Sequence, residues 1–220
     1  MQSPANQKQI DWEIIYPGLI DYATGLELQE KYWNAVKNGG KFILLLLEHQ
    51  PVITLGRRTD PSHLLLSETE LKERGIELFH ANRGGSATYH GPGQLVGYII
   101  CKSSRYGGIH SVVERALKSI NRVMNNFEIK SYIDYENPGV WTNTEPPRKL
   151  AAVGMSNKDG YTMHGFAINV DLPLTGFSAI VPCGLTLPVS TMSIEIGKRI
   201  DLSQVENDFI KEFEMLFQRK

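Results

Sequence analysis

The stretch Leu150–Val170, LAAVGMSNKDGYTMHGFAINV, decides the fold class of this 220-residue chain. Two apolar segments, Leu150–Asn157 and Tyr161–Val170, are separated by Lys158-Asp159-Gly160. An Asp-Gly pair between two such segments predicts a tight hairpin turn. The stretch therefore predicts two neighbouring antiparallel strands that are joined without a helical crossover.

In the rest of the sequence, predicted strands outnumber predicted helices. Further strands are predicted at Asp11–Tyr16, Lys41–Glu48, Val52–Arg57, Ile76–Arg83, Leu95–Lys102, Ser131–Tyr135 and Val140–Thr142. Helices are predicted at Tyr22–Lys37, at a short segment capped by Ser67 with Glu70 as its capping-box partner, at Ile109–Phe127 and at Ser203–Gln218. We expect one α/β (α+β) domain over residues 1–220, with a mixed, mainly antiparallel sheet and flanking helices.

The composition is that of an ordinary globular protein, 41% hydrophobic and 21% charged, with a formal net charge of -1. Without an excess of Lys and Arg to neutralise phosphates, the chain is not expected to bind nucleic acid. The longest apolar run, Phe42–Leu47, is too short to cross a bilayer, and the polar start Met1–Gln9, which we expect to be flexible, has no signal segment. The two cysteines, Cys101 and Cys183, form no disulfide framework. We therefore expect a cytoplasmic protein that does not associate with membranes.

The segment Gly84–Gly97 is the most unusual in the chain, and the overlapping glycine-rich segment Arg83–Gln94, RGGSATYHGPGQ, is a candidate to carry chemistry. Glycine lets the backbone approach a ligand closely, and exposed N–H groups in such a loop bind anions or carbonyl oxygens. The segment matches neither the P-loop nor the Rossmann pattern, so no nucleotide site is indicated. The alternative is a plain connection between strands, with His90 as a structural histidine.

Cys183 and Lys149 are the candidates for covalent chemistry. Cys183 lies in Val181–Leu185, VPCGL, within a predicted loop over Gly176–Pro188, where a substrate could reach the thiol. Lys149 begins the apolar stretch that follows Arg148, and an ammonium beside a thiol raises its thiolate fraction. The alternatives are a small buried cysteine and a solvated lysine, and spacing alone does not bring the two residues together.

With His49–Arg57 and His164–Val170, these segments resemble the octanoyl-[acyl carrier protein]:protein N-octanoyltransferases. The shared motifs run in family order from Glu48 to about Gly184, well over half of the chain. The resemblance implies a fold similar to that of the biotin and lipoate protein ligases, with Cys183 as the nucleophile and Lys149 as its partner. The substrate-binding residues that it implies are Arg83, Gly84, Gly85, Ser86, Ala87, Thr88, Tyr89, His90, Ala152, Val153, Gly154, Gly165, Phe166 and Ala167.

The same resemblance implies a reaction in lipoate biosynthesis. Octanoyl-acyl carrier protein would give its octanoyl group to Cys183, and the thioester would pass it to a lysine of a lipoyl domain. The acceptors would be 2-oxoacid dehydrogenase E2 subunits and the glycine-cleavage H protein, and we expect a monomer without cofactor or metal. Lys149 would lower the thiol pKa and then act as general base, while backbone N–H groups near Gly85 or within 149–154 would hold the oxyanion. His90 would orient the site, and Arg57, Arg58 and Arg148 are candidates to contact the acidic carrier protein.

Two departures from the family pattern are mild. Phe166 replaces a smaller aliphatic residue and could trim the acyl pocket, and Thr142–Pro147 is longer than usual. The nearest alternative function is an ATP-dependent lipoate or biotin protein ligase, which needs no cysteine. A binding module without activity, or a cysteine hydrolase with His90, His110 or His164 as its base, would be of another class.

Overall fold

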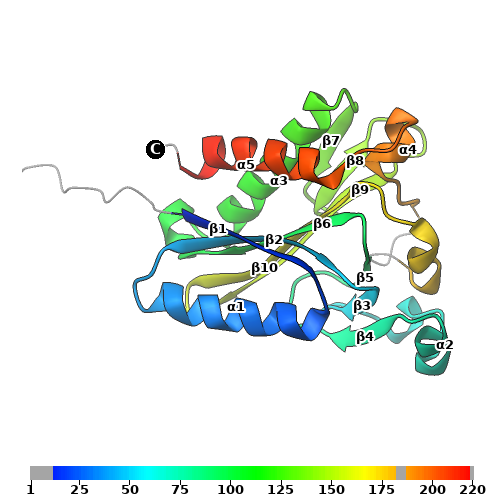
Figure 1. Cartoon of the computed structure of the whole chain (residues 1–220), viewed down its shortest axis with the longest axis horizontal. Coiled ribbons are helices and arrows are strands. Elements are labelled where there is room, and N and C mark those ends of the chain that lie inside the picture. Colours follow the sequence, from blue (N-terminus) through cyan, green and yellow to red (C-terminus); the bar gives the residue numbers. More distant parts are fainter. Residues whose placement is uncertain (1–11, 182–186, 219–220) are drawn as a thin grey trace, which may run out of the picture.

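The structure, a computed structural model, describes residues 12–181 and 187–218. Its centre is a seven-stranded sheet (Figure 1) in which β1 and β2 are parallel and the other neighbouring strands are antiparallel. In order across the sheet, the strands are β1 (Trp12–Ile20), β2 (Phe42–His49), β6 (Gln94–Ile100), β10 (Tyr161–Asn169), β9 (Lys149–Lys158), β8 (Gly139–Thr142) and β7 (Ser131–Asp134). The predicted mixed, mainly antiparallel sheet is confirmed.

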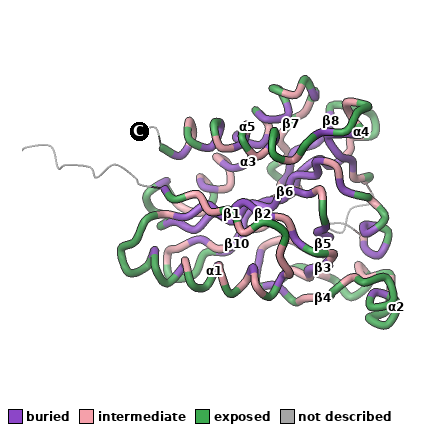
Figure 2. Tube along the Cα trace, in the orientation of Figure 1, coloured by how far each residue is buried: buried purple, intermediate pink, exposed green. Residues whose placement is uncertain are grey.

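Helices cover both faces of this sheet. Helix α1 (Tyr22–Lys37) lies on one face, and α3 (Ile109–Asn126) and α5 (Leu202–Phe217) lie on the other (Figure 1). Alternate residues of β2 therefore enter two different apolar clusters, which explains its unbroken apolar run. Figure 2 shows the buried residues concentrated along the central strands.

The hairpin that was predicted from Leu150–Val170 joins β9 to β10. Lys158 pairs with Tyr161, and the two residues between them, Asp159 and Gly160, have φ of 52° and 83°. Positive φ at both central positions is the geometry of a type I′ turn, which explains the Asp-Gly pair. The turn also contacts α1, where the Lys37 Nζ lies 2.6 Å from the Asp159 carboxylate.

A second, three-stranded sheet packs beside the first. Its strands, in order, are β4 (Glu77–His80), β3 (Val52–Leu55) and β5 (Ala87–His90). Between β3 and β4 in the chain lies α2 (Glu68–Glu73), where Ser67 and Glu70 form the predicted capping box. The prediction is confirmed because each residue satisfies a backbone N–H of the other.

Two predictions about loops were wrong, and one short α-helix was not predicted. Four residues of the glycine-rich segment, Ala87–His90, form strand β5, because Thr88 and Tyr89 are strand formers that pair with β3. The loop predicted over 176–188 overlaps the 3₁₀ helix η3 (Leu174–Ala179), and α4 (Met192–Ile196) was not predicted because five residues carry no helical period. The remaining short helices are η1 (Pro61–His63) and η2 (Ser103–Tyr106).

Candidate active site

The glycine-rich segment contacts β9 and is held there by its own arginine. The buried Arg83 guanidinium donates from Nη2 to the Thr54 carbonyl (2.6 Å) and from Nη1 to the Gly84 carbonyl (3.0 Å). The Gly84 N–H donates to the Met155 carbonyl (3.1 Å), and a Cβ on Gly154 would stand 2.8 Å from the Gly84 oxygen. Glycine is therefore required where the two backbones meet.

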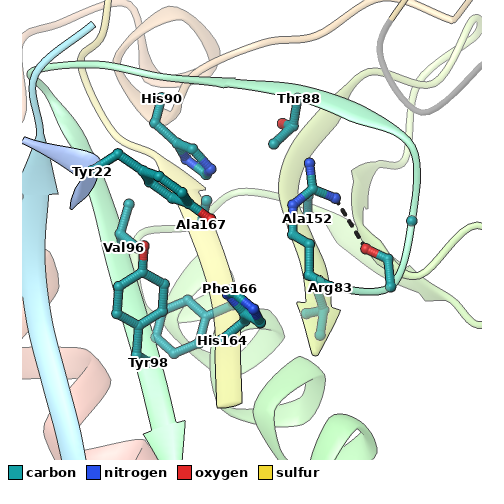
Figure 3. A pocket seen from close by; sticks show the side chains of 15 residues that line it. Tyr22, Arg83, Thr88, His90, Val96, Tyr98, Ala152, His164, Phe166 and Ala167 are labelled. Carbon is teal, nitrogen blue, oxygen red and sulfur yellow. Dashed lines mark hydrogen bonds between the residues drawn. The ribbon is translucent and has the colours of Figure 1, made fainter. Parts of the chain in front are cut away.

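A cavity lies between this segment, the start of α1 and the face of the large sheet that α1 covers (Figure 3). The empty space within it, together with the solvent at its open mouth, is about 520 Å³. It is lined by Tyr22, Arg83, Gly84, Gly85, Thr88, His90, Val96, Tyr98, Ala152, Val153, Gly154, His164, Gly165, Phe166 and Ala167.

All but three of the predicted substrate-binding residues of the glycine-rich segment, β9 and β10 line this cavity. The exceptions are Ser86, Ala87 and Tyr89. Because side chains alternate along a strand, Thr88 and His90 of β5 reach the cavity while Ala87 and Tyr89 enter an apolar cluster behind it. The Ser86 hydroxyl instead contacts helix η1.

Four lining residues were missing from the predicted set: Tyr22, Val96, Tyr98 and His164. Val96 and Tyr98 lie two apart on β6, so strand alternation would have found them once that face was known. His164 belongs to the motif His164–Val170. Tyr22 comes from a distant part of the sequence, and no local signal points to it.

His164 has an unusual backbone conformation, with φ of 60°, one residue before β10 begins to pair with β6. Positive φ is strained for a residue with a side chain. The fully buried Gln29 of α1 stabilises it, since Gln29 Oε1 accepts from the His164 N–H at 2.8 Å. Helix α1 therefore shapes the cavity through Gln29 as well as through Tyr22.

The Phe166 ring is fixed by core packing. Its centroid lies 4.5 Å from that of Phe209 on α5, and the two residues share the core cluster between the sheet and α5. The ring fills the place above Gly97, where a Cβ would stand 2.0 Å from its Cζ. The next residue, Ala167, belongs to the cluster on the opposite face with Tyr98. The size of residue 166 is thus explained by the missing side chain at Gly97.

We expect Gly97→Ala to lower the free energy of unfolding by about 1–3 kcal/mol, because the new methyl group would overlap the Phe166 ring. In a chain that also carries Phe166→Leu, the alanine should be tolerated. Urea denaturation of the wild type, both single variants and the double variant measures this coupling. Strictly additive losses would contradict the contact.

Three buried histidines are neutral at pH 7: His90 and His164 line the cavity, and His49 contacts its lining residue Tyr98. Burial lowers the pKa of His49 to about 4, of His90 to about 3 and of His164 to about 4. The His49 Nδ1 donates to the Ile20 carbonyl (3.1 Å), so its Nε2 accepts from the Tyr98 hydroxyl (2.6 Å). His90 and His164 therefore contribute polar but uncharged groups to the wall of the cavity.

Stability should fall as the pH is lowered from about 6.5 to about 4. The unfolded chain takes up protons at the ordinary histidine pKa of 6.5, while the folded chain does so only near the lowered values. We expect His49→Gln to remove about 1–2 kcal/mol of the loss in unfolding free energy between pH 7 and pH 5. Urea titrations at several pH values measure it, with the exposed His110→Gln as control. Equal pH dependence in both variants would contradict the account.

Lys149 is the first residue of β9, and its side chain is only 6% exposed. The Nζ lies 4.8 Å from the centroid of the Trp141 ring on β8, a cation–π contact. The Lys149 N–H donates to the Pro188 carbonyl (2.9 Å), and its carbonyl accepts from the Ser190 N–H (3.0 Å). The segment that follows residues 182–186 is thus bonded directly to the Lys149 backbone.

Lys149 also lines a second, smaller cavity, whose empty space together with the solvent at its mouth is about 300 Å³. Thr88, Ala152 and Ala167 line this cavity and the first one alike, so the two adjoin through shared walls. Phe177 and Val189, from either side of residues 182–186, also line the second cavity. The two predicted site regions, the glycine-rich segment and Lys149, are therefore brought together.

The predicted nucleophile, Cys183, lies outside the described residues, as do residues 1–9. On one side of it, the Val181 N–H donates to the His63 carbonyl (2.8 Å), and on the other side Pro188 is bonded to Lys149. The second cysteine, Cys101, is fully buried, and burial raises the pKa of its thiol to about 12. Cys101 is therefore unsuited to act as a nucleophile.

Within residues 12–181 and 187–218, no cluster of three or more His, Cys, Asp or Glu side chains is arranged to hold a metal ion. None of the helices there combines the length and apolarity needed to span a membrane.

The chain is similar to known proteins in sequence and in structure. Residues 21–214 match the family model of the lipoyl protein ligase A/B catalytic domain. By structure, the chain is similar to a bi-partite lipoate protein ligase from Thermoplasma acidophilum, with a TM-score of 0.75 and 15% identity over 94% of this chain and 84% of that one. It is also similar to the biotin protein ligase of Aquifex aeolicus, with a TM-score of 0.53 and 13% identity over 92% and 67%. These matches confirm the predicted ligase-like fold.

The sequence comparison is more specific. An octanoyltransferase of Solibacter usitatus is 42% identical over 202 residues, which cover 91% of this chain and 90% of that protein. The chain belongs to the octanoyltransferase family. It is a transferase enzyme of lipoate biosynthesis, and at these identities the transferase is better supported than the ligase, with which only the fold is shared.

Proposed function

We propose that the chain takes an octanoyl group from octanoyl-acyl carrier protein onto Cys183 and passes it to a lysine of a lipoyl domain. The observation that carries this proposal is the position of Lys149 beside the cavity. The smaller cavity, which Lys149 lines, shares Thr88, Ala152 and Ala167 with the larger one. An acyl chain in the larger cavity would therefore present its carbonyl carbon toward Lys149. Phe177 and Val189, which precede and follow Cys183 in the sequence, line the smaller cavity with Lys149.

In the first step, Lys149 takes the proton of the Cys183 thiol, and the thiolate attacks the carbonyl carbon of the donor thioester. A new carbon–sulfur bond forms to Cys183, and the bond to the carrier sulfur breaks. The Lys149 ammonium favours the thiolate through its positive charge and then passes the proton to the carrier sulfur, so that the carrier leaves as a thiol and Lys149 is neutral for the second step. One thioester is exchanged for another, so the step is close to neutral in free energy.

In the second step, the amine of the target lysine attacks the Cys183 thioester. An amide bond forms, the Cys183 sulfur leaves as a thiolate, and the excess amine proton passes to Lys149, which acts as general base. Conversion of a thioester to an amide is favourable, so no ATP is required. Because Lys149 is buried on a strand, its amine is held in one position for both steps.

Backbone N–H groups would stabilise the oxyanion of both steps. Among the candidates, the N–H groups of Lys149 and Val153 already donate to the carbonyls of Pro188 (2.9 Å) and Pro138 (3.4 Å). We therefore assign this role to the N–H of Gly85. This residue lines the cavity, and its φ of 87° is a value that glycine adopts without strain.

The proposed donor is an acidic carrier protein, and the acceptors are lipoyl domains of E2 subunits and the H protein. Arg57 and Arg58 are exposed, and Arg57 is close enough to the cavity to help lower the pKa of His164. Arg148 forms a bidentate ion pair with Glu195 (2.9 and 2.7 Å). The carrier is thus proposed to dock on Arg57 and Arg58, while Arg148 stabilises the fold through its ion pair with Glu195.

A transfer assay without ATP tests the function. An apo-lipoyl domain incubated with octanoyl-acyl carrier protein and the enzyme should gain one octanoyl group, while free octanoate with ATP should give none. Modification from free octanoate and ATP, with none from the carrier thioester, would make the chain a ligase and overturn the proposal.

A further inference from the structure

Two buried amide side chains connect the cavity to Lys149. Gln94 begins β6 and Asn169 ends β10, the two residues pair in register, and they are 1% and 4% exposed. The Gln94 Nε2 donates to the Asn169 Oδ1 at 2.8 Å. Buried amides are costly unless their donors and acceptors are all engaged, so the partners of this pair define its orientation.

The hydrogen bonds of the pair run in one direction. Because the Gln94 nitrogen donates to Asn169 and to the Tyr89 carbonyl (3.3 Å), its Oε1 must be the acceptor for His90 Nδ1 (2.6 Å). His90 therefore carries its proton on Nδ1, and its Nε2 is left as an acceptor on a ring that points into the cavity (Figure 3). His90 is neutral because burial lowers its pKa to about 3.

At the other end, the Asn169 amide nitrogen holds two carbonyl groups. It donates to the Ser190 carbonyl (3.1 Å) and, more weakly, to the Lys149 carbonyl (3.4 Å). The same two residues are bonded to each other through the Ser190 N–H, and the Ser190 hydroxyl donates to Glu195. Asn169 thus joins three chain segments at the point where the Lys149 side chain begins.

We propose that Gln94 and Asn169 are positioning residues: they fix Lys149 against the segment 188–190 and lock His90 with Nε2 as an acceptor toward the cavity. Neither residue lines the larger cavity, and both line the smaller cavity together with Lys149. Both reach the chemistry through Lys149 and His90, so the inference rests on the proposed function of Lys149. It extends the site from the catalytic pair to a connected set of buried polar groups that spans β5, β6, β10 and β9.

Near-isosteric variants test the proposal. Asn169→Asp keeps the acceptor for Gln94 but removes the donor to the Lys149 and Ser190 carbonyls, and Gln94→Glu removes the donor to Asn169. We expect both to slow formation of the octanoyl-enzyme up to about 100-fold, with KM for octanoyl-acyl carrier protein changed little. The rate of Cys183 alkylation by iodoacetamide at neutral pH should fall toward that of Lys149→Ala, which a merely structural role would not cause.

Thr162→Val is the matched control, since it also removes a buried polar group of β10 that bonds the Ile99 carbonyl (2.6 Å), far along the strand from Asn169. Wild-type rates of acylation and alkylation in both amide variants would overturn the positioning role, as would equal losses in Thr162→Val. Failure of the wild type to form any adduct would instead count against the proposed function. In that case the alkylation rates still decide the positioning role, which requires them to fall in Asn169→Asp and not in Thr162→Val.

Discussion

The Cys183→Ala variant is expected to form no octanoyl-enzyme and to transfer octanoyl groups on the order of 10⁴- to 10⁶-fold more slowly than the wild type. The thioester intermediate needs a sulfur at this position, and removal of a nucleophile forfeits the covalent route entirely. Steady-state transfer to an apo-lipoyl domain and the mass of the enzyme after incubation with the donor both measure the loss.

Cys101→Ala supplies the matched control for this prediction. Its thiol is fully buried near Thr162, and burial raises its pKa to about 12, so it is protonated and out of reach of a donor. We expect this variant to form the adduct at the wild-type rate. An adduct that survives in Cys183→Ala and disappears in Cys101→Ala would show that the wrong cysteine has been assigned.

The Lys149→Ala variant is expected to lower the rate of transfer by about 10²- to 10⁴-fold, the range of a general acid–base group. Both half-reactions should slow, because Lys149 first favours the Cys183 thiolate and then accepts the amine proton. The binding of the acyl chain should change little, since the wall of the larger cavity is intact. Rapid-mixing measurements of acyl-enzyme formation and of its decay with a lipoyl domain separate the two steps.

Lys158→Ala is the control for Lys149. It lies at the far end of the same strand and also makes a cation–π contact, with its Nζ 5.0 Å from the Trp33 ring. This variant should retain wild-type rates. If the two lysine variants lost activity equally, the loss in Lys149→Ala would reflect packing on β9 instead of proton transfer.

The sequence predicted the elements that local pattern defines. The Asp-Gly turn, the bounds Tyr22–Lys37 of α1 and the Ser67–Glu70 capping box follow from turn chemistry, helical spacing and capping, which act within a few residues. Strand β5 was not predicted within the glycine-rich segment, because it is defined by pairing with β3. That strand lies more than thirty residues earlier, so the pairing is not a local property of the sequence.

The site was predictable only in part for the same reason. Motifs indicated the glycine-rich segment, Lys149 and the start of β10, but not the contribution of Tyr22, which α1 brings to the cavity from a distant part of the chain. Strand alternation separates His90 from Tyr89, and this could be assigned only once the core face of β5 was known. The link from His90 through Gln94 to Asn169 requires the register of β6 with β10, which no motif encodes.

Intact-protein mass spectrometry of the enzyme after incubation with octanoyl-acyl carrier protein, followed by peptide mapping and addition of an apo-lipoyl domain, tests the covalent route through Cys183. We expect one octanoyl group, located on the peptide that contains Cys183 and lost when the lipoyl domain gains it. An enzyme that transfers octanoyl groups at full rate without ever carrying one, or that carries it elsewhere, would show that Cys183 is not the nucleophile.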